Sequence, residues 1–371
     1  MKPVTKPQNP NFSSGPCSKR PGYDVANLKL DTLGRSHRSA IGKAALQQAC
    51  SQTAEILNLP EGYRVGVVPA SDTGAMELIM WSVLGARPVD VFAWESFGKD
   101  WVTDIVKQLK LDGVHSYLAD YGELPDLSQA NPEHDTVFTW NGTTSGVRLE
   151  DADWISDRRA GLTICDATSA VFGMSLPWEK LDVVTYSWQK VLGGEGAHGM
   201  LILSPRAVER LESYDPPWPL PKIFRLTKNR VLNEGIFKGA TINTPSMLCV
   251  ADYLDALDWV AEIGGQSATI ARSEQNLEVI KTFVEQHDWI HFLARDAAQV
   301  SNTSVCLTLD LDADKVADMV KLLAFEGVAF DIGAYRDAPA GLRIWCGATV
   351  EKADVVALMP WVEWAYHTVQ Q

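Results

Sequence analysis

A lysine that follows a short apolar stretch is the residue best suited to chemistry in this sequence. Residues 183–187 are predicted as a buried strand, Lys190 comes three residues later, and Gly193 and Gly194 follow it. In α/β proteins, a strand followed by a glycine-rich turn presents functional groups at the edge of the sheet. A lysine that is partly shielded from water there can lose its proton and attack carbonyl groups. On this stretch alone, a solvated loop lysine is the simpler interpretation.

A carboxylate precedes this lysine by 24 residues, because Asp166 ends another apolar stretch, residues 162–165. Pyridoxal phosphate chemistry requires this pair of groups, since a carboxylate keeps the pyridine nitrogen protonated and a lysine forms the Schiff base. Asp166 could instead cap the helix that follows it. A metal site is the weaker interpretation, because no histidine or second carboxylate accompanies Asp166 at ligand spacing.

Alternating apolar patterns predict the elements that hold these two residues. Strands are expected at residues 65–69, 89–94, 113–118, 136–141, 162–166, 182–187 and 198–203. Helical spacing is found at residues 39–59, 75–84 and 99–111. This alternation predicts an α/β fold with a mostly parallel sheet that is covered by helices on both faces. Functional side chains should therefore gather at the strand ends.

The C-terminal part predicts a second, smaller α/β unit with an antiparallel sheet. Helices are expected at residues 246–263 and 266–286, and they are followed by a strand, a helix, two strands and a helix at residues 304–309, 312–325, 328–332, 342–346 and 352–369. We expect an N-terminal extension of residues 1–15, a large domain of residues 16–255 and a small domain of residues 256–371. No internal repeat is found.

Composition excludes several classes of protein. The 371 residues are 46% hydrophobic and carry a net charge of -14, which argues against a nucleic-acid-binding protein. No apolar stretch reaches the roughly 18 residues of a membrane-spanning helix, and the first residues lack the apolar core of a signal peptide. The six cysteines form no Cys-x-x-Cys pair, so a reduced, cytoplasmic protein without a membrane partner is expected. No GxGxxG or phosphate-loop motif indicates nucleotide binding.

Further motifs accompany Lys190 and Asp166 along nearly the whole chain. They are NFSSGP at residues 11–16, SHRS at 36–39, NGTTSG at 141–146, QK at 189–190, INTP at 242–245 and GLR at 341–343. Together they resemble the phosphoserine aminotransferases, which are class V aminotransferases that use pyridoxal 5'-phosphate. The resemblance implies the fold-type I architecture, in which a large domain with a mostly parallel sheet carries a smaller C-terminal α/β domain.

The resemblance implies roles for residues around the cofactor. Lys190 matches the Schiff-base lysine, Asp166 matches the partner of the ring nitrogen, and Thr143 matches the hydroxyl that binds the phenolic oxygen. The residues that match the family's phosphate ligands are Ser71, Asp72, Gln189 and, from the second subunit, Asn243 and Thr244. A phosphate needs converging donors of this kind, ideally at a helix N-terminus. The family pattern also implies a homodimer with shared active sites.

Substrate recognition is implied to depend on cations, because the family's small-molecule substrates are anionic. Arg343 matches the anchor of the α-carboxylate, which a guanidinium can bind with two parallel hydrogen bonds. His37 and Arg38 match the pair that binds the distal anion across the dimer interface, and Arg336 matches a further phosphate-binding arginine. Without the resemblance, these residues would be interpreted as helix-capping or solvated loop residues.

The sequence departs from the commoner family pattern in three places. The phosphate loop is residues 70–74, Ala-Ser-Asp-Thr-Gly, in place of a glycine-rich loop with an arginine. The ring-stacking tryptophan corresponds to Phe97, with Trp101 as a rival. A histidine before the phosphate-binding arginine is replaced by Tyr335. These changes indicate a divergent branch and leave the exact substrate preference open.

We therefore expect amino transfer from glutamate to 3-phosphohydroxypyruvate, as in serine biosynthesis. The resemblance also allows 4-phosphohydroxy-L-threonine, as in pyridoxine biosynthesis. The alternatives are another class V enzyme (a serine or alanine:glyoxylate aminotransferase, or a cysteine desulfurase) and a catalytically silent protein that binds pyridoxal phosphate. A desulfurase needs a mobile catalytic cysteine, whereas Cys346 lies in a strand-like stretch. Intact Lys190 and Asp166 argue against a silent protein.

Overall fold

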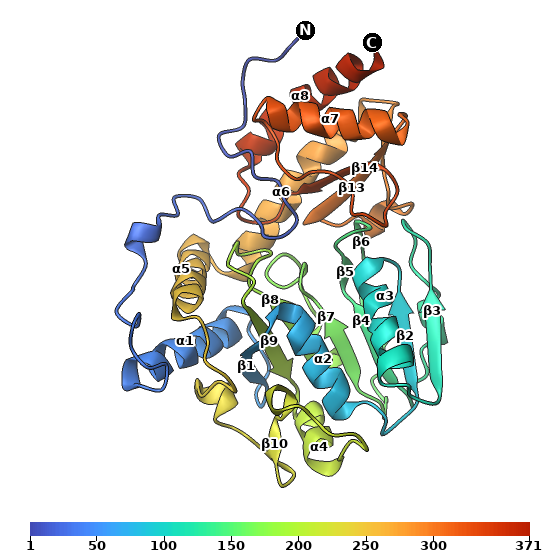
Figure 1. The fold of residues 1–371 in the computed structure, drawn as a ribbon. Helices are drawn as coiled ribbons and strands as arrows, with labels where there is room; N and C mark the ends of the chain where they lie inside the picture. Colours follow the sequence, from blue (N-terminus) through green and yellow to red (C-terminus); the bar gives the residue numbers. More distant parts are fainter.

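A seven-stranded sheet forms the centre of the larger part of the molecule (Figure 1). In the computed structural model, which describes residues 1–371, the strand order is β1-β9-β8-β7-β4-β2-β3. The strands are β1 (Arg64–Pro69), β2 (Val89–Ala93), β3 (Val114–Leu118), β4 (Asp135–Thr139), β7 (Thr163–Asp166), β8 (Val183–Ser187) and β9 (His198–Leu203). Only β9 runs antiparallel to its neighbours, β1 and β8. The predicted mostly parallel sheet is thus confirmed.

Both faces of this sheet are buried. In β8, Val183 belongs to an apolar cluster that includes residues of α2 (Ser71–Val83) and α4 (Pro205–Ser213). Its neighbour Val184 belongs to a larger cluster that includes residues of α1 (Ala40–Ile56) and α5 (Met247–Ile263). Because successive strand residues point to opposite faces, a strand that is buried on both sides must be apolar at every position. That requirement produces the uninterrupted apolar stretches of the sequence.

Two helices that border the strand ends begin earlier than the sequence predicted. α2 starts at Ser71, and α3 (Ser96–Thr103) starts after Glu95, whose side chain accepts a hydrogen bond from the N–H of Gly98. These helices were expected at residues 75–84 and 99–111, so their first residues, 71–74 and 96–98, were missed. α3 continues into a π-helical turn, Asp104–Gln108. α4 was not predicted at all.

The C-terminal part contains a three-stranded antiparallel sheet, β12 (Ile290–Phe292), β13 (Ser304–Leu309) and β14 (Gly341–Trp345). Its helices are α6 (Gln266–Glu285), α7 (Ala313–Phe325) and α8 (Lys352–Gln370). The strand predicted at residues 328–332 is wrong. Phe330 forms only an isolated bridge with Asn11, and Asp331 has a left-handed backbone (φ 57°) that ends any extended stretch. The third strand is instead the short β12, which the sequence analysis missed.

The N-terminal segment connects the two parts of the molecule. Figure 1 shows the N-terminus beside the C-terminal helices. The N–H of Phe330 donates to Pro10 (2.9 Å), the N–H of Trp345 donates to Phe12 (3.0 Å), and the N–H of Cys17 donates to Gln189 (2.8 Å). We retain the division at residues 15 and 255 as a proposal, although residue 255 lies within α5.

The remaining elements are short. Two small hairpins pair β5 (Asn141–Gly142) with β6 (Val147–Arg148) and β10 (Thr227–Lys228) with β11 (Val231–Leu232). Turns of 3₁₀ helix lie at Val25–Asn27, Leu127–Gln129, Trp178–Lys180, Lys222–Phe224, Ile236–Lys238 and Ala297–Gln299. None of the helices combines the length and apolar character needed to cross a membrane.

Candidate functional site

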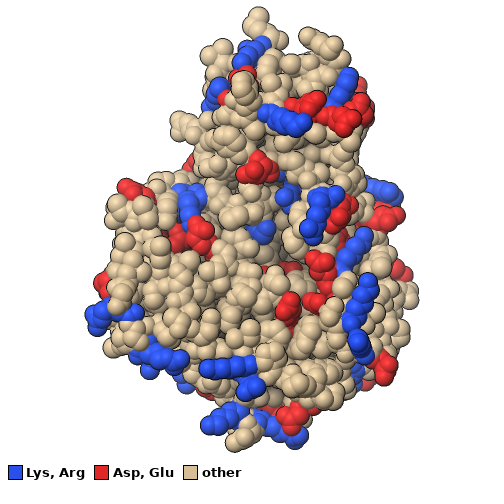
Figure 2. All heavy atoms as spheres, in the orientation of Figure 1, with Lys and Arg blue, Asp and Glu red and all other residues tan.

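A pocket lies at the carboxyl ends of four neighbouring strands, β2, β4, β7 and β8. Its empty volume, including the open mouth, is about 490 Å³. The residues that line it are Ser71, Asp72, Thr73, Glu95, Phe97, Trp101, Thr139, Asn141, Thr143, Asp166, Thr168, Gln189 and Lys190. Figure 2 shows this side of the molecule hollowed between the C-terminal part and the larger part, with basic and acidic side chains at the hollow. Seven of the residues predicted for the cofactor therefore meet in one pocket.

Lys190 is held in this pocket out of contact with bulk water. Its side chain is only 8% exposed, and its amine donates a hydrogen bond to the carbonyl oxygen of Ser14. Burial lowers the pKa of the amine below its ordinary value, and the nearby charge of Arg343 lowers it further, against the opposing charges of Asp166 and Glu95. The amine is therefore easier to deprotonate than that of a surface lysine. The solvated-loop interpretation of Lys190 is wrong.

The approach of the backbone to Lys190 explains a glycine in the first motif. A Cβ atom placed on Gly15 would collide with the amine of Lys190, and Gly15 has φ 152°. Any other residue here would require the end of the Lys190 side chain to move, and its backbone would be strained at this φ. Gly15 thus belongs to the site although it carries no functional group.

Asp166 is oriented by two donors. One carboxylate oxygen accepts the backbone N–H of Thr168 (3.0 Å) and the other accepts the indole N–H of Trp101 (3.1 Å). The residue is 7% exposed. Trp101 therefore contacts Asp166 through its ring edge, while Phe97 lines the same pocket beside it. Phe97 stays the predicted stacking residue.

The backbone changes direction sharply where α2 begins. Ala70 and Ser71 both have left-handed φ values, 67° and 57°, which are uncommon for residues other than glycine. This turn directs the start of α2 at the pocket, where the first N–H groups of a helix have no partner within the helix. Gln189 lies at the same pocket, and its side-chain oxygen accepts the hydroxyl of Ser187. These groups are suited to bind an anion.

The side chain of Asp72 points away from solvent and lies at Asp166. It is 6% exposed, and it faces the side chains of Asp166, Thr168 and Thr185. Burial and the charge of Asp166 raise the pKa of this carboxyl group well above its ordinary value. Its backbone N–H remains a candidate phosphate donor. Its carboxyl group therefore faces Asp166, whereas the family pattern had indicated a ligand of the phosphate.

Glu95 is a pocket residue that the sequence analysis missed. Its carboxylate is fully buried and accepts the N–H of Gly98 (2.7 Å) and the hydroxyl and N–H of Thr144 (2.6 and 3.3 Å). Burial raises its pKa to about 7, although the hydrogen bonds from Thr144 and Gly98 oppose the shift. Glu95 follows the end of β2, so the strand-end argument that singled out Asp166 would have found it.

Thr143 lies in the pocket as predicted, on the loop that follows β5. Its hydroxyl donates to Ser169 (2.8 Å), and its carbonyl oxygen accepts the hydroxyl of Ser304 (2.6 Å). Ser304 begins β13, and its hydroxyl also lies 3.1 Å from that of Ser14. The small sheet thus supports the loop that carries Thr143.

Comparison with known proteins identifies the family. No family model matches the chain. A curated phosphoserine aminotransferase of Methanosarcina barkeri is 59% identical over 370 residues, which cover 100% of both chains. The chain belongs to the phosphoserine aminotransferase family. Solved phosphoserine aminotransferases have the same fold: that of Cytophaga hutchinsonii matches with a TM-score of 0.82, 20% identity and 96% and 99% coverage, and that of Trichomonas vaginalis with 0.77, 16% and 96% and 100%.

The arginines that the family pattern implies for substrate lie at the edge of this phosphoserine aminotransferase site. Arg343 is half-buried in β14 and close enough to Lys190 to lower the pKa of its amine, and its Nε has no hydrogen-bond partner. Arg336 is 74% exposed and lies 3.4 Å from Asp337. Both guanidinium groups lie over the ring of Tyr335, at 5.3 Å for Arg336 and 5.5 Å for Arg343. Tyr335, which departs from the commoner family pattern, therefore lies against two predicted arginines.

Four residues that the family pattern assigns across the dimer interface lie outside the pocket of the single chain. Asn243 and Thr244 are exposed before α5. His37 is half-buried and Arg38 is exposed before α1. The imidazole Nε2 of His37 is buried without a hydrogen-bond partner. One chain alone does not bring these side chains to Lys190.

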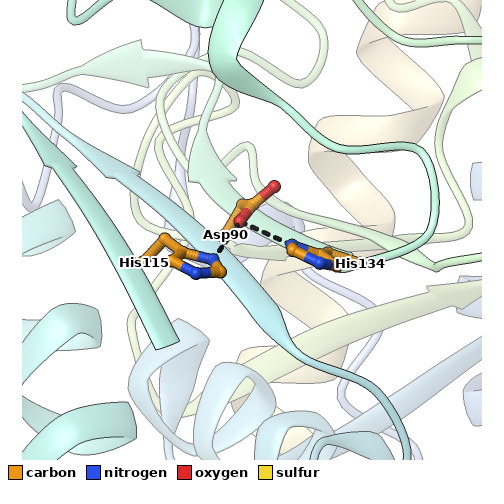
Figure 3. Close-up of side chains that lie close together, drawn as sticks. All are labelled: Asp90, His115 and His134. Carbon is orange, nitrogen blue, oxygen red and sulfur yellow. Dashed lines mark hydrogen bonds and ion pairs between the residues drawn. The ribbon is translucent and has the colours of Figure 1, made fainter. Parts of the chain in front are cut away.

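A second polar cluster lies at the opposite ends of the strands from the pocket. His115 and His134 both direct Nδ1 at one oxygen of Asp90, at 3.0 and 2.9 Å (Figure 3). The three ligand atoms lie within 4.8 Å of one another, as metal ligands do. However, Asn131 accepts the N–H of Glu133 (3.0 Å) through its side-chain oxygen, so its amide nitrogen donates to Nε2 of His134 (3.2 Å). His134 then carries its proton on Nδ1 and donates it to Asp90. This favours a cluster of hydrogen bonds that joins neighbouring strands over a metal site.

Proposed function

We propose that the protein transfers the amino group of glutamate to 3-phosphohydroxypyruvate, giving O-phospho-L-serine and 2-oxoglutarate. The observation that carries this proposal is the shared pocket of Lys190 and Asp166, a buried amine and an oriented carboxylate, with the N-terminus of α2 beside them. The M. barkeri relative bears the corresponding name over its full length. We also propose a cytoplasmic location, which the six unpaired cysteines support.

The residues of the pocket fit pyridoxal 5'-phosphate. Buried polar atoms are normally hydrogen-bonded, yet a side-chain oxygen of each of Thr139, Asn141 and Thr168 has no partner within the chain. These atoms line one pocket, so a polar ligand there would satisfy them. The T. vaginalis relative is described with pyridoxal phosphate bound.

Each end of the pocket suits one end of this cofactor. Asp166 would accept the ring N–H, the hydroxyl of Thr143 would bind the phenolic oxygen, and Ser71, Gln189 and the first N–H groups of α2 would bind the phosphate. When it is bound, pyridoxal phosphate supplies an aldehyde that carries the amino group and a ring that takes up electrons from the substrate.

The chain itself supplies proton transfer and orientation. The amine of Lys190, with its lowered pKa, would accept the proton from the α-carbon of the amino acid and return it at the other reacting carbon. Arg343 would bind the α-carboxylate through its unpartnered Nε and its terminal nitrogens. Burial of Lys190 and Asp166 keeps water from competing for these groups.

A homodimer with shared active sites would complete the anion-binding set. Asn243 and Thr244 of the partner subunit would reach the phosphate of the cofactor, and His37 and Arg38 of the partner subunit would bind the distal anion of the substrate together with Arg336. The exposure of Arg38, Asn243 and Thr244 in the single chain supports this arrangement. Because the chain carries a net charge of -14, these few placed cations would dominate the attraction for substrate.

The proposal is tested with purified protein, pyridoxal phosphate, glutamate and 3-phosphohydroxypyruvate in an assay of 2-oxoglutarate formation. Wild type should be yellow and active, and Lys190→Ala should show no turnover. The oxo-acid precursor of 4-phosphohydroxy-L-threonine is tested in the same assay, because the same cations suit it. Turnover with pyruvate or glyoxylate, and none with 3-phosphohydroxypyruvate, would favour another class V aminotransferase. Protein that stays colourless after the cofactor is added would favour a catalytically silent protein.

A further inference from the structure

Two carboxyl groups meet at the buried end of the pocket, and no cation pairs with either of them. Asp72 and Asp166 are 6% and 7% exposed and face one another. The acids and bases around the pair are Cys165, next to Asp166 in β7, and Glu95 and Lys190 across the pocket. The amine of Lys190 is bound to the carbonyl oxygen of Ser14 and forms no ion pair with the two carboxyl groups. Two anions in contact under these conditions repel strongly.

The surroundings of the two groups differ in the number of donors. Asp166 accepts hydrogen bonds from the N–H of Thr168 and the indole of Trp101, and both bonds stabilise its anion. The carboxyl group of Asp72 faces the hydroxyls of Thr168 and Thr185, which oppose the rise of its pKa, but its Oδ1 has no hydrogen-bond partner. The N-terminus of α2 favours an anion at Asp72, but this helix dipole competes with burial and with two direct donors at Asp166. A single proton in the pair therefore belongs on Asp72.

We propose that Asp72 keeps this proton and donates it in a hydrogen bond to Asp166, so that Asp166 faces the cofactor's ring nitrogen as a carboxylate with one negative charge. Asp72 is then a positioning residue that acts through Asp166, and no proton leaves the pair. The raised pKa of Asp72 agrees with this placement. The inference rests on the proposed function only because the pocket must bind pyridoxal phosphate.

The proposed hydrogen bond has two effects on Asp166. It fixes the carboxylate from a third direction, in addition to Thr168 and Trp101. It also lowers the basicity of the carboxylate, so that the proton of a bound pyridinium ring stays on the ring nitrogen. A second full negative charge at Asp72 would reverse this effect.

The experiment compares how tightly three variants bind pyridoxal phosphate and pyridoxal, which lacks the phosphate. Asp72→Ala should weaken the binding of both ligands about tenfold, because a hydrogen bond to a charged group is lost. Asp72→Asn should recover most of this loss, since its amide can still donate to Asp166. Ser71→Ala is the matched control one residue away, and it should weaken pyridoxal phosphate while leaving pyridoxal unchanged.

A second readout follows the pH dependence of the visible absorption band of the bound cofactor. Its midpoint should shift in Asp72→Ala and lie near that of wild type in Asp72→Asn. Weaker binding of pyridoxal phosphate alone in Asp72→Ala would overturn the inference, because the side chain would then act on the phosphate. Equal defects in Asp72→Asn and Asp72→Ala would also overturn it, as they would indicate an ionised Asp72.

The two proposals fail in different ways. A wild type that binds neither ligand would overturn both the proposed function and this inference. A wild type that binds both ligands, with Asp72→Ala indistinguishable from it, would overturn this inference alone. Melting of each cofactor-free variant shows that a binding defect does not come from loss of the fold.

Discussion

Three carboxyl groups and one amine line the pocket, and burial shifts the pKa of Asp72, Glu95 and Lys190. Asp166 has two donors, Asp72 has none at one oxygen, and Glu95 has three. Burial raises the pKa of Asp72 and Glu95 because it disfavours their charged forms, and the hydrogen bonds that Glu95 accepts oppose its shift. The lowered pKa of the Lys190 amine follows from the same burial. The pocket therefore binds protons differently from the unfolded chain, and pH should act on stability as well as on catalysis.

Glu95 should make the cofactor-free protein less stable as the pH rises. Its pKa is about 7 in the folded protein against an ordinary 4.5, so the folded state holds the proton more tightly. Its contribution to stability is unaffected below pH 4.5 and becomes increasingly unfavourable up to about pH 7. Across this window, the free energy of unfolding of wild type should fall by up to about 3 kcal/mol relative to Glu95→Gln. Urea unfolding at a series of pH values measures the difference, and parallel curves would contradict it.

Gly15→Ala should impair the site without unfolding the protein. The added methyl group collides with the amine of Lys190, so the lysine must move and cofactor binding should fall at least about tenfold. Binding of pyridoxal phosphate, followed by its absorption, measures the effect. Gly34→Ala is the matched control, because Gly34 also has a positive φ (68°) but nothing lies within 4 Å of its Cβ position. Equal effects in both variants would indicate backbone strain instead of the collision.

At the scale of elements, the carboxyl ends of the strands meet at the pocket. At the opposite end of β4, a buried ion pair joins the sheet to α4. In β4, Asp135 accepts two hydrogen bonds from Arg210 of α4, at 2.8 and 3.1 Å, and one from the N–H of Leu162 (2.8 Å). The carboxylate of Asp135 is fully buried and the side chain of Arg210 is 10% exposed. These contacts anchor α4 away from the pocket.

Arg210→Ala should therefore destabilise the fold and leave the chemistry intact. Removing the guanidinium leaves a buried carboxylate without its partner, which costs about 3–5 kcal/mol. Urea unfolding measures the loss. The control is Arg230→Ala, because Arg230 and Asp215 are 59% and 62% exposed, and such surface pairs contribute less than about 1 kcal/mol. A loss of similar size in both variants would contradict the argument.

The sequence predicted strands and helices correctly where one physical rule dominates. The parallel strands have uninterrupted apolar stretches because both faces of the sheet are buried, and their polar ends identify Lys190 and Asp166. The strand expected at residues 328–332 failed because Phe330 pairs with the N-terminal segment, a contact between distant parts of the chain. Asp72 was assigned to the phosphate loop, and only the fold places its carboxyl group at Asp166. Glu95 was overlooked although the same rule applies to it.

At the scale of the whole molecule, one chain holds a cofactor pocket but leaves predicted anion ligands on its surface. Arg38, Asn243 and Thr244 are exposed, whereas Lys190 and Asp166 are buried. The proposed shared active site would account for this distribution, since each copy would supply ligands to the pocket of the other.

Mixing two inactive variants tests the shared site. Lys190→Ala removes the proposed catalytic amine of its own pocket, and Arg38→Ala removes a ligand that is proposed to act in the partner's pocket. After subunit exchange, half of the dimers are mixed and each contains one intact site, so about a quarter of wild-type activity should return. Transamination rates before and after exchange measure this recovery. No recovery, with exchange confirmed by mass, would place Arg38 in its own subunit's pocket, whereas full activity of Arg38→Ala before exchange would place it outside the site.

The contacts of residues 10–17 have a consequence for biosynthesis. The carbonyl oxygen of Phe12 accepts a hydrogen bond from the N–H of Trp345, and Ser14 contacts both Lys190 and Ser304. Residues 10–17 can therefore form these contacts only after the chain has been synthesised as far as β14. Until then, the contact between the amine of Lys190 and Ser14 is not held in place by the C-terminal part. A nascent chain stalled before β14 should consequently be unable to capture pyridoxal phosphate, so cofactor loading would report that β14 has been synthesised.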